Sequence, residues 1–487
     1  MLTQLDFLSL MPLIIVSVTA VLVMLAIAFY RHHSFNATLS VIGLNLALVS
    51  TLMVWAVPPH PVTVLLSMDH FSLIAITLML VATLASATFS HIYMQNKPGQ
   101  REELYLLLLL SLAGGMVLVS SRHFASLFIG LEMLSIPLYG LVAYTLQHER
   151  SLEAGIKYLV LSASASAMML FGMALIYADT GSLAFADISQ HITSMGDQVS
   201  LLVMCGSALI LVALAFKLSL APFHLWTPDV YEGAPAPVGA FLATTAKIAV
   251  AYALMRLVAY FPVFNQPTFN TILLVLAGVS ILVGNILAMT QTNIKRLLGY
   301  SSIAHFGYLM VAMAALNFAT LEAFSVYLIT YTLATLAAFG VVTVVSISDE
   351  AISKESIDAD SLHRYRGLFW KQPYLAAVLT VAMLSLAGIP MTAGFIGKFY
   401  MILAAVNAAD WYLLGIIVIG SAIGLYYYLR VVVTLFMTEP GMARYRIPFH
   451  WSRTAGGIVL VLIAAAIILL GVFPEPLLEL ATLGDLQ

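Results

Sequence analysis

Residues 201–223 read LLVMCGSALILVALAFKLSLAPF, an apolar run that contains one lysine, Lys217, and one proline, Pro222. A helix needs about 20 mostly apolar residues to cross the hydrocarbon core of a bilayer, so this run predicts a membrane span. A proline inside a helix removes one backbone hydrogen bond and clashes with the carbonyl four residues earlier, here that of Leu218. The run therefore predicts an interrupted membrane helix with a charge beside the interruption.

The rest of the chain has the same apolar character. Of its 487 residues, 62% are hydrophobic and 9% are charged, and the mean hydropathy is +1.01. A soluble globular protein has roughly 25% charged residues, so the composition excludes a soluble enzyme, a disordered chain and a nucleic-acid-binding protein. The net charge of −3 gives no reason to expect a polyanionic partner. One cysteine, Cys205, allows neither a disulfide nor an iron–sulfur or thiolate zinc site. The composition indicates a polytopic membrane protein.

Apolar runs between polar, proline or glycine breaks predict fourteen membrane helices and leave too little sequence for a soluble domain. The fold class expected from them is an all-α membrane bundle. The expected spans are 8–29, 37–57, 70–94, 103–120, 123–146, 154–178, 201–223, 236–262, 271–290, 296–316, 320–346, 374–402, 411–436 and 455–475.

Lysine and arginine are distributed unevenly over the connections. Connections after odd-numbered spans hold most of the 20 lysines and arginines, for example Arg31, Arg150 and Arg364, whereas connections after even-numbered spans hold only Arg122. Cytoplasmic loops of membrane proteins have an excess of these residues. The odd connections are therefore expected in the cytoplasm, and both termini on the outer side of the membrane.

Four ionisable residues fall near the middle of expected spans: Glu132, Lys217, Lys247 and Lys398. A charge at a helix centre costs on the order of 3 kcal/mol, and such residues commonly line an ion or proton path. The structural alternative is a static ion pair, but one glutamate leaves two of the lysines without a carboxylate. A lysine whose carboxylate partner can approach and withdraw would be a proton switch. A further cation, Arg256, lies near the outer end of its span and is expected to snorkel to the interface.

Three expected spans contain a proline close to their buried charge: Pro137, Pro222 and Pro390. Carbonyls freed at membrane depth are tolerated where they line a watery cavity or meet other protein groups, so each proline is expected to break its helix there. The sequences LSLAP at 218–222 and LSLAGIP at 384–390 lie five spans apart, and an odd number of spans inverts orientation. The pattern predicts two inverted five-helix repeats, the fourth to eighth and ninth to thirteenth spans, with the seventh and twelfth helices broken.

Three further residues are candidates for proton transfer. His305 shares a polar stripe of its span with Ser301 and Tyr308. Histidine titrates near neutral pH, so His305 is either a proton shuttle or a packing histidine. His224 and Asp229 follow the proline-rich end of the broken seventh span. They are either a proton-access point on the cytoplasmic side or part of a plain interfacial turn.

Three segments have a structural interpretation. The run SASASA at 162–167 favours close helix packing, because small side chains let backbones approach. The tyrosines at 426–428 are typical of an aromatic belt at the membrane surface. The connection 347–373 mixes acidic and basic residues, and it is either a solvated loop or a docking surface for a partner.

Several catalytic motifs are absent from the sequence. It contains no phosphate-binding loop, dinucleotide fingerprint, paired-histidine metal motif or nucleophile elbow. We therefore expect no metal and no bound ATP, NADH or redox cofactor on this chain. A transport step would take its energy from an ion gradient or from another subunit.

Five motifs surround the candidate residues: GLEMLSIPLYGLVAY at 130–144, FKLSLAPFHLWTPDVYEGAPAPV at 216–238, TTAKIA at 244–249, NIKRLLGYSSIAHFGY at 293–308 and GIPMTAGFIGKFY at 388–400. With them the chain resembles, over its whole length, the antiporter-like membrane subunits of proton-pumping NADH:quinone oxidoreductase, respiratory complex I. Within that family it is most similar to the bacterial N subunits, which have a lysine in the twelfth span.

The resemblance implies one transmembrane domain in four parts. Three N-terminal helices come first, the two repeats follow, and one helix ends the chain, with expected boundaries 1–100, 101–265, 266–437 and 438–487. The animal mitochondrial counterparts lack the three leading helices. Their presence here favours a bacterial source and the bacterial inner membrane as location.

The resemblance also implies roles and partners. Glu132 and Lys217 would form an ion pair that modulates the protonation of the lysine. Lys247 would be the central relay, with His305 in the same path, and Lys398 would exchange protons with the outer side. The partners would be lipid and other membrane subunits in a hetero-oligomer, with NADH, flavin, iron–sulfur clusters and quinone on other subunits. Two other functions stay open, a subunit of a multisubunit cation/proton antiporter and a structural spacer.

Overall fold

Long apolar runs fold into helices in a membrane, because the backbone has no polar partner there except itself. The computed structural model is accordingly helical almost throughout the part of the chain that it describes. This confirms the all-α membrane fold. The described residues are 3–95, 101–146, 148–196, 199–315, 318–348, 358–438 and 454–482.

The secondary structure consists of helices and one pair of two-residue strands, which are antiparallel. Among the helical elements, η1 is a π-helix, whereas η2 and η3 are 3-10 helices. In chain order the elements are α1 (Gln4–Ser9), α2 (Met11–Phe29), α3 (His33–Val54), β1 (His60–Pro61), β2 (Ser67–Met68), α4 (His70–Met94), α5 (Glu103–Val119), α6 (Phe124–Val142), α7 (Glu149–Thr180), α8 (Phe185–Met195), α9 (Leu201–Leu218), α10 (Trp226–Gly233), α11 (Ala236–Phe241), η1 (Leu242–Ala246), α12 (Lys247–Tyr260), η2 (Pro262–Asn265), α13 (Pro267–Met289), α14 (Ile294–Ala315), α15 (Phe318–Ser348), η3 (Leu362–Tyr365), α16 (Leu368–Lys371), α17 (Pro373–Ala387), α18 (Ala393–Asn407), α19 (Trp411–Phe436), α20 (Ala455–Val472) and α21 (Glu475–Thr482).

Within the described residues, 12 helical segments are long and apolar enough to cross a membrane, and α5, α17 and α18 are shorter apolar helices. These helices coincide with the expected spans, apart from small differences at their ends. The fourth expected span is α5, and the twelfth is divided into α17 and α18. Because these helices are short, the count of fourteen spans stays a prediction.

Two of the three expected helix breaks are confirmed. α9 ends at Leu218, and the next residue, Ser219, has a left-handed φ of 64° before a turn leads to α10. α17 ends at Ala387 and is followed by Gly388, with a φ of 81°, before α18 begins. Each break therefore starts with a left-handed residue that ends a half-helix, ahead of the proline.

The expected break at Pro137 is wrong. α6 stays helical from Phe124 to Val142 with Pro137 in its interior. A proline removes only one backbone hydrogen bond from a helix, and neighbouring side chains can satisfy exposed carbonyls. Here Ser111 of α5 donates its hydroxyl at 2.7 Å to the carbonyl of Leu134. Leu134 is next to Met133, whose carbonyl loses its helical donor at the proline.

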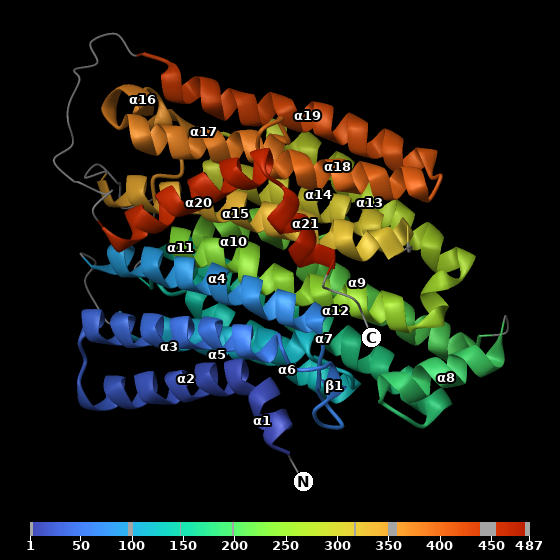
Figure 1. Ribbon diagram of the computed structural model, residues 1–487. Helices are drawn as coiled ribbons and strands as arrows, with labels where there is room; N and C mark the ends of the chain where they lie inside the picture. The colour runs from blue at the N-terminus through green and yellow to red at the C-terminus, as the bar shows by residue number, and fades with distance from the viewer. Residues whose placement is uncertain are drawn as a thin grey trace.

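The membrane helices lie side by side in one bundle (Figure 1). α2 and α3 form one side of the bundle and α19 the opposite side, while α20 packs on α15, α17 and α18. The continuous segment of α11, η1 and α12 is the most enclosed, because its apolar stretch is buried completely. Lys247, in the middle of that segment, therefore lies in the core of the bundle.

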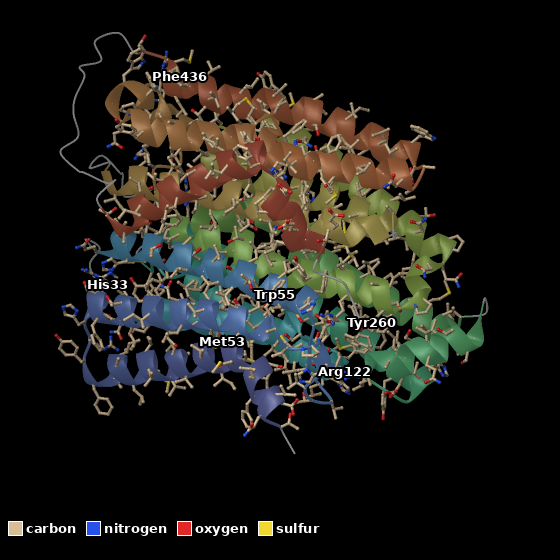
Figure 2. The ribbon with its side chains drawn as sticks, in the orientation of Figure 1. His33, Met53, Trp55, Arg122, Tyr260 and Phe436 are labelled. Carbon is tan, nitrogen blue, oxygen red and sulfur yellow. The ribbon has the colours of Figure 1, made fainter. Side chains whose placement is uncertain are left out.

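The two ends of the bundle carry different connections. Figure 2 labels His33 and Phe436 at one end, and Arg122 and Tyr260 towards the other. His33 begins α3 and Phe436 ends α19, so the first end holds connections that follow odd-numbered spans. Arg122 lies in the connection between α5 and α6. The fold thus reproduces the alternation on which the expected orientation rests, although which end faces the cytoplasm stays a prediction.

Arg256 does not reach the membrane surface, so the expectation that it snorkels is wrong. Its side chain is 2% exposed, and its guanidinium donates to both carboxylate oxygens of Asp69 at 2.7 and 2.8 Å. Asp69 caps the start of α4. Burial alone would raise the pKa of the Asp69 carboxyl, but the arginine outweighs burial and holds the pKa below its usual value. The pair fastens α12 to α4.

The connection after α15 was expected to be either a solvated loop or a docking surface. The first alternative is wrong, because part of this connection is buried. Asp358 is fully buried, and it accepts hydrogen bonds from Lys295 Nζ at 2.7 Å and Tyr93 Oη at 2.6 Å. Lys295 Nζ also donates to the carbonyl of Ala234 at 2.9 Å. This cluster ties α4, α14 and the end of α10 to the connection. Residues 349–357 of the same connection lie outside the described residues.

Breaking the buried Lys295–Asp358 pair should destabilise the protein far more than breaking an exposed pair. Asp358→Asn leaves a buried ammonium without its carboxylate, a change that costs about 3–5 kcal/mol. Glu153→Gln removes one partner from the exposed pair with Lys157, and such pairs contribute about 0–1 kcal/mol. We expect the thermal unfolding midpoint in detergent to fall by several degrees only for Asp358→Asn. Equal midpoints for the two variants would contradict this role of the buried pair.

Candidate functional site

Lys217 lies in the last turn of α9 and is buried. Its ammonium donates to the hydroxyl of Ser135 on α6 at 2.7 Å and to that of Ser162 on α7 at 2.6 Å. A buried charge is costly unless it is hydrogen-bonded, and neutral hydroxyls provide the acceptors here. Three helices therefore contribute to the surroundings of this lysine.

Glu132 lies on α6 and makes no direct contact with Lys217. Its carboxylate accepts a hydrogen bond from Ser166 of α7, with 2.5 Å between Oγ and Oε1. The salt bridges of the described residues do not include the ion pair that the resemblance implies for Glu132 and Lys217. Ser162 and Ser166 stand one turn apart on α7, so each of the two charges has its own hydroxyl partner on that helix.

A close approach of α7 and α9 brings Ser162 to Lys217. Gly172 and Gly206 face each other, and a Cβ built on Gly206 would lie 2.6 Å from the carbonyl oxygen of Gly172. Only glycine fits at such a crossing, and small residues commonly mark the contacts of membrane helices. The run 162–167 lies on the same α7, but two of its serines also bind the buried charges.

Lys247 follows directly after η1, the π-helical turn. Such turns are rare and frequently accompany functional sites. Lys247 Nζ donates to the carbonyl of Leu218 at 3.2 Å and to Ser302 Oγ at 2.9 Å, and it lies 4.7 Å from the ring centroid of Phe306. The sequence predicted that the freed Leu218 carbonyl lines a watery cavity or meets another protein group. The structure shows the second alternative, and the group is the ammonium of Lys247. Since Leu218 follows Lys217, the two lysine sites adjoin.

His305 lies on α14 between two tyrosines. Its Nδ1 is 2.7 Å from Tyr327 Oη and its Nε2 is 3.0 Å from Tyr428 Oη. Ser301, one turn earlier, also shares a hydrogen bond with the hydroxyl of Tyr428. A hydroxyl can donate or accept, so both ring nitrogens keep a partner in either neutral tautomer. His305 is therefore held in place while it remains able to change which nitrogen carries the proton.

The three consecutive tyrosines do not form an aromatic belt, so that prediction is wrong. Tyr426 is 57% exposed, whereas Tyr427 and Tyr428 are buried. Tyr427 donates to Asn285 at 3.1 Å, and Tyr428 is a partner of His305. Successive residues of a helix point about 100° apart. Three tyrosines in a row cannot all face lipid, and that geometry was a signal available in the sequence.

Lys398 lies on α18, the second half of the broken helix, and is buried. Its Nζ donates to the carbonyl of Ala387 at 2.8 Å and lies 5.4 Å from the ring centroid of Tyr308. Ala387 is the last residue of α17, immediately before the left-handed Gly388. At this break, too, a lysine donates to the carbonyl at the end of the half-helix. The position of the proline differs, because Pro390 comes two residues after Gly388.

A small cavity between His305 and Lys398 has room for one water. Its volume is about 10 Å³, and about 10–15 Å³ suffices for a water that finds two to four polar partners. Tyr331 connects the cavity to Lys247, because its hydroxyl donates at 2.8 Å to Ser302, which also accepts from Lys247. The polar lining consists of His305, Tyr327, Thr330, Tyr331, Ser385 and Lys398.

His224 and Asp229 have different surroundings. Asp229, on α10, pairs with Arg296 at 2.7 Å and with Lys157 at 3.0 Å. Burial alone would raise the pKa of the Asp229 carboxyl, but the two cations outweigh burial and hold the pKa below its usual value. His224 is buried, and its Nδ1 has no hydrogen-bond partner in the described part of the chain. A proton-access role for either residue stays a prediction.

Sequence reasoning missed the hydroxyl side chains of the site: Ser135, Ser162, Ser166, Ser302 and Tyr331. A search for buried charge does not find them, because a neutral hydroxyl is common in membrane helices. Their spacing offered a partial signal, since two of the serines recur four residues apart on α7.

No group of three or more histidine, cysteine, aspartate or glutamate residues that could hold a metal ion occurs in the described ranges. The arrangement is suited to moving protons along buried lysines and hydroxyls.

A helical membrane bundle with two broken helices and a buried row of lysines defines the class of antiporter-like transport subunits. The family model described as "NADH:quinone oxidoreductase/Mrp antiporter, TM" matches residues 121–424. The NADH-quinone oxidoreductase subunit N of Ectopseudomonas mendocina (strain ymp) is 55% identical over 98% of this chain and 96% of its own length. The protein of the same name from Chromohalobacter salexigens is 54% identical over 97% and 98%. The chain therefore belongs to the NADH:quinone oxidoreductase/Mrp antiporter transmembrane family.

Solved structures of membrane complexes contain similar chains. A chain of respiratory complex I from Thermus thermophilus, with 34% identity, matches with a TM-score of 0.81 over 97% of this chain and 100% of its own. A chain of an archaeal membrane-bound sulfane sulfur reductase, with 25% identity, matches with a TM-score of 0.83 over 99% and 97%. A chain of the Mrp complex from Dietzia sp. DQ12-45-1b, with 21% identity, has the same fold, with a TM-score of 0.85 over 99% and 97%.

Replacing Tyr428 by phenylalanine should slow proton transfer, whereas the same change at Tyr426 should not. Tyr428→Phe removes the buried hydroxyl that binds His305 and Ser301, while Tyr426→Phe removes a hydroxyl from an exposed side chain. We expect the proton-pumping rate of membrane vesicles to fall roughly three- to tenfold for Tyr428→Phe, the size of one lost hydrogen bond. Equal losses in both variants would contradict a specific role of the buried hydroxyl.

Proposed function

We propose that this chain is a proton-translocating membrane subunit of NADH:quinone oxidoreductase, without redox chemistry of its own. The observation that carries the proposal is the buried row of Lys217, Lys247 and Lys398, in which every ammonium donates to neutral hydroxyls or backbone carbonyls. Membership of the family supports the same conclusion. NADH, flavin, iron–sulfur clusters and quinone belong to other subunits of the assembly.

The neutral partners suit these lysines to reversible proton transfer. A lysine bound to neutral acceptors can lose its proton without leaving a buried carboxylate uncompensated. The hydroxyls of Ser135 and Ser162 can rotate, so that they accept from the ammonium and donate to the amine. Lys217 therefore keeps hydrogen-bond partners in both protonation states, which is what a proton carrier at membrane depth requires.

The proposed path runs from Glu132 and Lys217 to Lys247, through their adjoining sites at Leu218. From Lys247 the hydroxyls of Ser302 and Tyr331 lead to the small polar cavity. His305 and Lys398 also line that cavity, and Lys398 exchanges protons with the outer side of the membrane. Quinone reduction elsewhere in the complex drives the charge rearrangement along this path.

The proposed location is the bacterial inner membrane, with both termini on the periplasmic side. The unequal distribution of lysine and arginine over the two ends of the bundle supports this orientation. The proposed partners are lipid and other membrane subunits in a hetero-oligomer. The similar chains of known structure support assembly, because each belongs to a multisubunit membrane complex.

The second candidate function is a subunit of a multisubunit cation/proton antiporter. The likeness to a chain of the Mrp complex favours it only at the level of the fold, since that identity is 21%. Two observations separate the candidates: whether redox subunits co-purify with the chain, and whether Na⁺ alters transport. A purely structural spacer, the third candidate, would gain nothing from buried lysines at membrane depth.

Neutralising Lys217 should lower the coupled activity of the assembled complex. We expect membranes with Lys217→Ala to contain a normal amount of complex and to show slower NADH:quinone turnover and proton pumping, by about tenfold or more. The matched control is Lys371→Ala, which removes a lysine of α16 outside the buried row. The measurement uses a tag on this chain, a mild-detergent purification and activity assays of the co-purified subunits.

Two outcomes of this experiment would overturn the proposal. Normal turnover and pumping in an assembled complex with Lys217→Ala would remove the lysine row as the proton path. If no redox subunit co-purifies with the wild-type chain, the assignment to the oxidoreductase is lost and the antiporter becomes the leading function.

A further inference from the structure

The serines of the run 162–167 do not all face the same way. Ser162 and Ser166 are buried, four residues apart on one face of α7, whereas Ser164 is exposed on the opposite face. The hydroxyl of Ser164 donates to the carbonyl of Val160 within its own helix. The two buried hydroxyls instead reach side chains of other helices, so they do more than permit close packing.

Each buried serine binds a different member of the Glu132–Lys217 pair. Ser166 donates to the Glu132 carboxylate at 2.5 Å. Ser162 accepts from Lys217 Nζ at 2.6 Å and also shares a hydrogen bond of 2.6 Å with Tyr139 Oη. The carboxylate and the ammonium are therefore both hydrogen-bonded, yet they do not bind each other.

This arrangement is unexpected from electrostatics alone. Opposite charges attract more strongly in the interior of a membrane protein than in water. An unrestrained glutamate and lysine at this depth would close into a direct ion pair. The structure shows charge-assisted hydrogen bonds that oppose this closure. Ser166 of α7 binds Glu132, while Lys217 is bound by Ser162 of α7 and by Ser135 of α6.

We propose that Ser162 and Ser166 are positioning residues that hold Lys217 and Glu132 as a separated pair, and that loss of the Ser166 hydrogen bond lets the pair close. The inference rests on the proposed function, and it adds a role for the serines of α7. Closure would fix the proton on Lys217, because a carboxylate in contact stabilises the ammonium. The separated state, in which Lys217 has neutral partners only, is the state from which the lysine can release its proton.

The experiment compares Ser166→Ala and Ser162→Ala with Ser164→Ala, a matched change on the exposed face of the same helix. All variants are made in the complete complex, and its content in membranes is measured along with NADH-driven turnover and proton pumping. We expect both buried-serine variants to lower the coupled rate roughly three- to tenfold, in keeping with the loss of one hydrogen bond to a charged group. We expect Ser164→Ala to match the wild type.

Rescue and double variants separate positioning from packing. Ser166→Thr keeps the hydroxyl and should restore most of the rate, whereas Ser166→Cys keeps the size but weakens the donor and should not. Adding Ser166→Ala to Glu132→Gln should cause no further loss if the serine acts through the carboxylate, because residues that act as a unit are not additive. The comparison of Ser166→Thr with Ser166→Cys keeps the test decisive even if Ser166→Ala assembles poorly.

Each outcome decides one of the two proposals. Full activity of Ser166→Ala and Ser162→Ala, beside slow Glu132→Gln and Lys217→Ala variants, would overturn the role of the serines and leave the proposed function intact. Additive losses in the double variant, or equal rates for Ser166→Thr and Ser166→Cys, would also overturn that role. Full activity of Glu132→Gln and Lys217→Ala would instead overturn the proposed function.

Discussion

The constraint on which this structure depends is that a carbonyl freed from a helix inside the membrane must find a donor. Lipid offers no donor in the hydrocarbon core, so the donor comes from the protein or from water in an internal cavity. The two broken helices expose Leu218 and Ala387, and the donors are Lys247 and Lys398. Burying a lysine and breaking a helix are each costly at this depth. Together they cost less, because the ammonium donates to the carbonyl that the break exposes.

The buried cations fall into two groups by the charge of their partners. Arg256 and Lys295 pair with Asp69 and Asp358, whereas the lysines of the row donate to hydroxyls and carbonyls. Deprotonating a cation of the first group would leave a buried carboxylate uncompensated, which is strongly unfavourable. Those pairs therefore serve as fixed links between helices, while the lysines with neutral partners remain free to change their protonation state.

Much of this organisation could be predicted from the sequence, because charge in an apolar span is conspicuous. The helices, the breaks beside Pro222 and Pro390, and the burial of three lysines follow from residue types and spacing alone. The pairing of Arg256, the burial of Asp358 and the continuity of α6 could not be predicted in that way. Each depends on a group from another helix, and one sequence does not tell which side chains of two helices meet.

The two expected repeats differ in the positions of their lysines, although the backbone at their helix breaks is similar. A lysine precedes the proline in the seventh span and follows it in the twelfth, so the lysine positions do not correspond. The acceptors do correspond, because Leu218 and Ala387 each end a half-helix immediately before a left-handed residue. The donor to Leu218 is Lys247, which begins α12 in the following membrane segment. The donor to Ala387 is Lys398, which lies on α18, the second half of the same broken span. The two breaks thus share an exposed carbonyl with a lysine donor, but the lysine comes from a different position in each.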